Sequence, residues 1–173
     1  STFTLGEGRI TTVSLDNYDV NHFNVGGDTG GIWESYDYGQ SWSVLTDDYT
    51  RLNVRSLLIS PHDSSEFYWG STDGLIFRSV DGGNTWSEFT DFTSGDVLKI
   101  RISPDNPSVM FAAVEFNGIY KTLDGGANWS LIHSNSVTGY DLEFDPNNAN
   151  NIMATGNSVF MSRDGGVTFT EDT

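Results

Sequence analysis

Four aspartates recur along the chain at a nearly constant spacing, and carboxylates are side chains that perform acid–base chemistry and bind cations. Asp37, Asp81, Asp124 and Asp164 lie 44, 43 and 40 residues apart. Each falls in a box with the pattern Ser/Thr-x-Asp-x-Gly-x-x-aromatic, which reads SYDYGQSW, SVDGGNTW, TLDGGANW and SRDGGVTF. Because the same box returns in every unit, we expect each copy to do the same local, structural job rather than catalysis.

The composition of the box is that of a tight turn. An Asp that opens a turn accepts hydrogen bonds from backbone amides one to three residues on. The glycines that follow, such as Gly82 and Gly83, supply the positive φ angles of a short hairpin. An aromatic then enters the next strand, where it can pack inward and bury a large area. These aromatics are Trp42, Trp86, Trp129 and Phe169.

The similarity between the units extends well beyond the box. Each unit contains four short apolar runs separated by Gly, Asn, Asp or Pro, and none has the periodicity of a helix. Four strands in about 40–45 residues are typical of a β-propeller blade. The sequence therefore predicts an all-β propeller of four-stranded antiparallel blades, near residues 8–49, 50–92, 93–134 and 135–173, in a single domain over residues 1–173.

The boxes SVDGGNTW and TLDGGANW resemble the Asp-box, also called the bacterial neuraminidase repeat, and four units of it cover nearly the whole chain. The resemblance implies a β-propeller like those of sialidases, xyloglucan-active endoglucanases, sortilin-type receptors, a photosystem assembly factor and secreted bacterial surface proteins. These proteins share little chemistry, so the resemblance favours a fold without selecting a reaction.

Composition narrows the classes of partner. The formal charge of −16, with 24 acidic against 8 basic residues, disfavours nucleic acid and anionic lipid. The longest apolar run, Val109 to Val114, is too short to insert across a membrane. The absence of Cys removes disulfides and thiolate metal sites, and His22, His62 and His133 lack metal-site spacing.

We expect no cofactor and no metal. Asp47 and Asp48 offer oxygen ligands for Ca²⁺, but no defined calcium loop surrounds them. The resemblance and a surface rich in Asp, Asn, Gly, Ser and Thr favour a secreted or cell-surface protein.

One aspartate outside the boxes is a catalytic candidate. The stretch Gly26 to Trp33 is similar to the segment that carries a catalytic Asp in the xyloglucan-active enzymes, and this resemblance would make Asp28 one of two carboxylates flanking a glycosidic bond. The second carboxylate of that family comes from a second propeller domain, which this sequence lacks. Asp73 occupies the same loop in the next unit, so a turn role is the competing interpretation. A sialidase is disfavoured because Arg9-Ile10-Thr11 lacks the Pro of that family's signature.

In propellers of this type, the loops between second and third strands and those between blades lie on one face. That face would gather acidic, amide and aromatic residues suited to a glycan or to a basic peptide. The candidate binding residues are Asp73, Glu115, Phe116, Asn117, Asn157, Tyr49 and Tyr140.

Our main hypothesis is a non-catalytic module that binds protein or glycan through this face. The alternatives are a glycoside hydrolase, or half of one, that uses Asp28, and a structural scaffold subunit of an export or adhesion complex. Thr2 to Leu5 could complete the fourth blade. Otherwise the ring takes further blades from a longer chain or from partner chains.

Overall fold

A computed structural model describes residues 9–46, 49, 53–134 and 141–172 of the chain. Within these ranges the regular structure is entirely strand, and no helix there is long and apolar enough to cross a membrane. Thr2 to Leu5, the proposed closing strand, and the Asp47-Asp48 pair lie outside the described residues.

The strands form four antiparallel sheets of four strands, each in simple chain order. The first sheet contains β1 (Ile10–Leu15), β2 (Phe23–Gly27), β3 (Gly31–Ser35) and β4 (Ser43–Val44). The second contains β5 (Ser56–Ile59), β6 (Phe67–Gly70), β7 (Leu75–Ser79) and β8 (Ser87–Asp91). The third contains β9 (Val97–Ser103), β10 (Asn106–Val114), β11 (Gly118–Thr122) and β12 (Ser130–His133). The fourth contains β13 (Asp141–Asp145), β14 (Asn148–Thr155), β15 (Val159–Ser162) and β16 (Thr170–Asp172).

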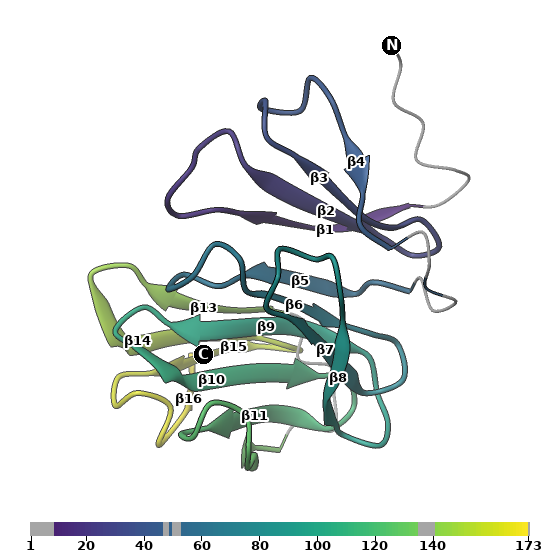
Figure 1. Cartoon of the computed structure of the whole chain (residues 1–173). Helices are drawn as coiled ribbons and strands as arrows, with labels where there is room; N and C mark the ends of the chain where they lie inside the picture. The colour runs from purple at the N-terminus through teal and green to yellow at the C-terminus, as the bar shows by residue number, and fades with distance from the viewer. Residues whose placement is uncertain (1–8, 47–48, 50–52, 135–140, 173) are drawn as a thin grey trace.

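Successive sheets pack through their first strands. β1 contacts β5, β5 contacts β9, and β9 contacts β13. Figure 1 shows the purple first sheet above the second, which lies between the first and third sheets. The chain is therefore an all-β propeller with four-stranded antiparallel blades, as the repeat predicted.

The hydrophobic core lies between neighbouring sheets. One cluster joins the first and second sheets around Ile32, Leu57 and Trp69, and two more fill the next two interfaces. Because the second sheet is covered on both faces, every residue of β5 and β6 is buried. Their sequences accordingly read as continuous runs, SLLI and FYWG, rather than as an alternation of polar and apolar residues.

The third box illustrates the hydrogen bonds of the repeated turn. Thr122 Oγ1 donates to Asp124 Oδ1 (2.7 Å) and accepts the Gly126 N–H (3.0 Å). The backbone N–H of Asn128 donates to Asp124 Oδ1 (2.9 Å), and its side-chain Nδ2 donates to Oδ2 (2.7 Å). These hydrogen bonds, led by that of the Asn128 side chain, lower the pKa of Asp124 to about 2. Equivalent contacts recur in the other three boxes.

Two details of the box differ from the sequence-based expectation. In every box the carboxylate accepts the amide four residues on, one beyond the expected range, and in the fourth box it also accepts the Val167 amide three residues on (3.0 Å), as expected. Each turn contains two consecutive left-handed residues, such as Gly125 and Gly126 at φ 68° and 93°. These lengthen the turn, so that the amide four residues on reaches the carboxylate. The box aromatics stand one residue before the fourth strand rather than within it. The positive φ angles themselves are confirmed, including that of Tyr38 (58°) in place of the first Gly.

The box also joins one sheet to the sheet before it. Trp86 is buried in the core shared by the first and second sheets, and Trp129 and Phe169 pack into the next two interfaces. A Cβ added at Gly126 would lie 2.2 Å from the ring of Phe89 in the preceding sheet. Trp42 instead packs edge-on against Phe23 of its own sheet, with ring centroids 5.2 Å apart.

Candidate ligand-binding face

The loops that follow each second strand and the loops between blades meet on one side of the molecule, here called the loop face. Backbone hydrogen bonds tie them together. The Val97 N–H donates to the Ser71 carbonyl (2.9 Å), and the Glu115 N–H donates to the Asp96 carbonyl (2.9 Å). These contacts place the two sets of loops side by side, in agreement with what the resemblance implied.

A chain of charges crosses the loop face from the first sheet to the loop that precedes the third. Arg55 Nη1 donates to Asp28 Oδ1 (2.8 Å), and Arg55 Nε lies 2.7 Å from Asp96 Oδ2. Arg9 Nη2 donates to the second oxygen of Asp28, Oδ2, at 3.2 Å. Both carboxylate oxygens of Asp28 are therefore paired with arginine. In this row of charged side chains the two arginines alternate with the two aspartates, so they offset part of the negative charge of the loop face.

Phe116 stands out on the loop face because it is exposed and has a left-handed backbone. Its relative exposure is 65% and its φ is 61°. For a residue with a Cβ, this conformation costs about 1–2 kcal/mol. Thr93 is also left-handed, at φ 67°, and the side chain of Asn117 donates to the Ser94 carbonyl between these two positions (2.9 Å). Strained residues of this kind cluster at functional sites.

The other candidate binding residues differ in how far they are exposed to solvent. Asp73 is exposed and accepts a hydrogen bond from Ser71 Oγ, and Asn157 is exposed in the loop before β15. Glu115 is half-buried beside Phe116. Tyr49 packs against the core of the first two sheets, and its hydroxyl accepts the Trp86 N–H at 2.8 Å. Tyr140 lies outside the described residues.

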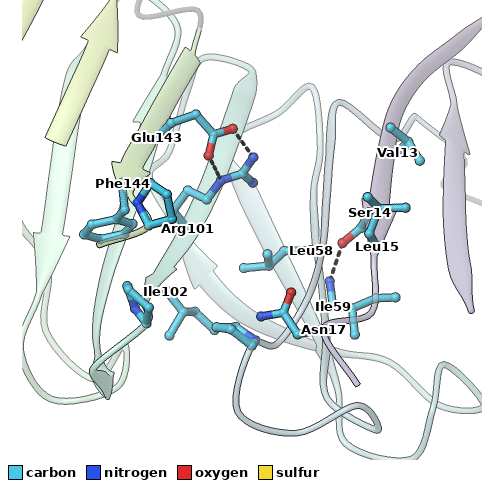
Figure 2. A pocket seen from close by; sticks show the side chains of 13 residues that line it. Val13, Ser14, Leu15, Asn17, Leu58, Ile59, Arg101, Ile102, Glu143 and Phe144 are labelled. Atoms are coloured by element: carbon cyan, nitrogen blue, oxygen red, sulfur yellow. Dashed lines mark hydrogen bonds and ion pairs between the residues drawn. The ribbon is translucent and has the colours of Figure 1, made fainter. Parts of the chain in front are cut away.

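A groove of about 340 Å³ runs along the innermost strands of all four sheets (Figure 2). Its apolar wall includes Val13 and Leu15 of β1. On the opposite wall the Arg101 guanidinium binds both oxygens of Glu143. Burial alone would raise the pKa of Glu143, but Arg101 and the neighbouring Lys99 outweigh it and lower that pKa. The sequence pattern does not predict this groove, because its lining residues come from four different repeats.

A buried polar cluster in the first sheet was also missed. His22 Nδ1 lies 2.7 Å from Asp16 Oδ2, and its Nε2 lies 2.9 Å from Glu34 Oε1, with all three side chains buried. The Tyr36 ring stacks on the imidazole at 4.2 Å. Burial, followed by the charge of Glu34, raises the pKa of Tyr36 to about 12. In the described part of the chain, no group of His and carboxylate side chains has the geometry of a metal site.

The repeated boxes, the four-stranded sheets and the loop face define an Asp-box β-propeller. The model of the Sortilin-Vps10 family, described as sortilin, neurotensin receptor 3, matches residues 30–157. The chain belongs to this family. No curated protein matches it.

Three solved structures illustrate the relationship. An ancestral GH74 enzyme superposes with a TM-score of 0.80 at 23% identity, over 96% of this chain and 24% of that one. YCF48 from Cyanidioschyzon merolae gives 0.70 at 18% identity, over 96% and 56% of the two chains. YCF48 bound to D1 peptide gives 0.51 at 19% identity, over 100% and 70%. At these identities the likeness concerns the fold, and the chain spans only about a quarter of the GH74 enzyme.

Proposed function

We propose that the chain is a non-catalytic propeller module, secreted or exposed at the cell surface, that binds a segment of another protein through the loop face. The observation that carries the proposal is Phe116. Its left-handed backbone is energetically unfavourable, yet its ring stays largely exposed. A partner that covers the ring would offset this unfavourable energy, since burying most of a Phe side chain contributes about 2 kcal/mol.

The charge of the loop face favours a basic segment. Asp73 is exposed and Glu115 is half-buried beside Phe116, and the whole chain has a formal charge of −16. Carboxylates next to an exposed aromatic complement a peptide with Lys or Arg beside an apolar residue. The structure of YCF48 bound to D1 peptide is a precedent for a peptide ligand on this fold.

The pairing of Asp28 supports binding over glycoside hydrolysis. A general acid or base must reach the scissile bond and exchange a proton there. Both oxygens of Asp28 are instead engaged by Arg9 and Arg55. We therefore assign Asp28 to the charge chain that holds the loops together.

A peptide selection tests the proposal. Random displayed peptides are selected on the 173-residue chain, and the affinities of the winners are measured by fluorescence anisotropy. We expect enriched sequences to combine a basic residue with an aromatic or aliphatic one. The Phe116→Ala variant should weaken their binding by about tenfold or more. Leu123→Ala is the matched control, because Leu123 is similarly exposed but lies in the third box, away from the loop face.

Two results would reject the proposal. Peptides that bind the wild type and Phe116→Ala equally well would show that the ring is not part of the site. Release of sugar from β-glucan that disappears in an Asp28→Asn variant would show that the chain is a hydrolase.

A further inference from the structure

A groove of about 490 Å³, here called the outer groove, lies between the second and third sheets. Residues of β8, the outermost strand of the second sheet, line one wall, and residues of β11 and of the third box line the other. Three half-buried aromatic rings form part of its surface, namely Phe92, Tyr120 and Trp129. The groove is therefore built where two sheets of this chain pack together.

The aromatic rings of the outer groove form one continuous surface. The ring centroids of Phe92 and Tyr120 are 4.5 Å apart, and those of Phe92 and Trp129 are 5.5 Å apart at an interplanar angle of 76°. Trp129 Nε1 donates to Thr90 Oγ1 (3.0 Å), which anchors the indole to the second sheet. Rings in direct contact leave no space between them. A ligand of this groove must therefore lie on the outside of the rings.

A carboxylate is held in the same groove. Asp91 is exposed, and it is the one charged side chain among the described residues that line the groove. Its Oδ1 accepts the backbone N–H of Thr93 at 2.6 Å, which fixes the position of the carboxylate. Thr93 is left-handed at φ 67°, a rare conformation for a β-branched residue. Backbone strain of this kind is typical of functional sites.

Arg78 shows what aromatic rings and a carboxylate hold elsewhere in the second sheet. Its guanidinium lies 5.9 Å from the ring centroid of Tyr68 and 5.6 Å from that of Phe89. Its Nε also donates to Glu66 Oε1 at 2.8 Å. A planar guanidinium can stack on rings and bind a carboxylate at the same time, which an ammonium group does less well. The outer groove offers the same two kinds of group, and its described lining contains no basic residue.

We propose that the outer groove binds an arginine side chain of the partner peptide, with the guanidinium on the aromatic rings and hydrogen-bonded to Asp91. This inference rests on the proposed function and assigns the basic residue of the peptide to one pocket. The groove adjoins the loop face, because Asn117 Nδ2 donates to the carbonyl of Ser94 (2.9 Å), the neighbour of Thr93. A peptide that covers Phe116 can therefore continue into the groove.

NMR with a single-residue probe tests the outer groove by itself. N-acetyl-arginine methylamide is added to the 173-residue chain, and the indole N–H resonance of Trp129 is followed. We expect a saturable shift that the uncharged citrulline analogue, of similar shape, does not cause. Asp91→Asn should weaken binding about fivefold, because it removes the charge that pairs with the guanidinium but keeps an oxygen for the Thr93 N–H. Glu88→Gln is the matched control, since Glu88 is exposed on β8 but outside the groove.

A second experiment connects the groove with the peptide site. Arginine is replaced by citrulline in the peptides selected on the wild-type chain. This change should weaken binding to the wild type about fivefold and leave binding to Asp91→Asn unchanged. Phe116→Ala should weaken the arginine and citrulline peptides by the same factor, because its ring and the groove contact different residues of the peptide.

The two experiments separate failure of the arginine site from failure of the peptide site. The arginine site is wrong if the arginine probe does not shift Trp129, if the citrulline probe shifts it equally, or if Asp91→Asn binds the arginine probe as tightly as the wild type. Peptides that are insensitive to Phe116→Ala would instead reject the peptide site. The single-residue probe would still decide the groove, because it contains no residue that could cover Phe116.

Discussion

Adjacent glycines in the third box give a sharp test of the role assigned to the repeated turn. Gly125 and Gly126 are both left-handed, so an Ala at either position meets the same backbone strain of about 1–2 kcal/mol. Replacing Gly by Ala also lowers the conformational entropy of the unfolded chain, which offsets about 0.4–1 kcal/mol of this strain. A Cβ at Gly125 has nothing within 4 Å. Gly125→Ala should therefore lower the free energy of unfolding by only about 1 kcal/mol.

Gly126→Ala adds a steric conflict to the same strain. Its Cβ would lie 2.2 Å from Cζ and 2.6 Å from Cε1 of Phe89, whereas carbon atoms in contact sit about 3.5–4.0 Å apart. Phe89 packs in the core between the second and third sheets, so its rigid ring cannot move without disturbing that core. Overpacking of this kind costs about 1–3 kcal/mol, and the total should reach about 2–4 kcal/mol.

Urea unfolding followed by Trp fluorescence measures the difference. With a slope of about 2 kcal/mol per molar urea, the midpoint of Gly126→Ala should lie about 1 M below that of Gly125→Ala. Gly83→Ala should lie between them, because its Cβ would meet Cδ1 of Leu45, the end of a flexible side chain, at 2.6 Å. Equal midpoints for the two variants at 125 and 126 would refute the argument that the box is a contact between blades.

Three further predictions address the polar contacts. The folded pKa of Asp124, about 2, lies below its unfolded value of about 4, so the stability that this carboxylate contributes is present above pH 4 and is lost as pH falls toward 2. Asp124→Asn should therefore make the free energy of unfolding fall less steeply between about pH 4 and about pH 2. An unchanged fall over that range would contradict the role assigned to Asp124. His22→Phe should lower the free energy of unfolding by about 3–5 kcal/mol, because the buried carboxylates of Asp16 and Glu34 lose their shared partner. Calorimetry measures this change, and a loss below about 1 kcal/mol would argue against the two contacts of His22. Ser14→Ala should cost about 1–3 kcal/mol, since the buried N–H of Ile59 loses its acceptor, and faster amide exchange at that N–H should accompany the loss.

The fold was predictable because the repeat fixes it several times over. A box at a constant spacing, with four apolar runs in each unit, leaves few architectures other than a propeller blade. The position of Asp28 in a loop after a second strand was also predictable from its spacing to Asp73. Its partners were not, because Arg9 is 19 residues away in the same repeat, and Arg55 belongs to the next repeat and meets Asp28 only once the first two sheets pack.

Other features depend on geometry that a sequence pattern does not carry. The sequence placed Tyr49 on a binding rim, while its hydroxyl is bound to the Trp86 amide, a contact between two repeats. The left-handed backbone of Phe116 was unpredictable because aromatic residues rarely adopt it. The binding role of Phe116 and its loop neighbours stays a prediction until the peptide experiment is done.

The burial of the second sheet on both faces has a consequence for how the molecule opens. Each sheet is stabilised mainly by its immediate neighbours, so the chain approximates a one-dimensional array of coupled units. Sheets cover the second sheet on both faces, and every residue of β6 is buried. A neighbouring sheet must therefore move away before β6 meets solvent, so the amides of β6 should be among the last to exchange.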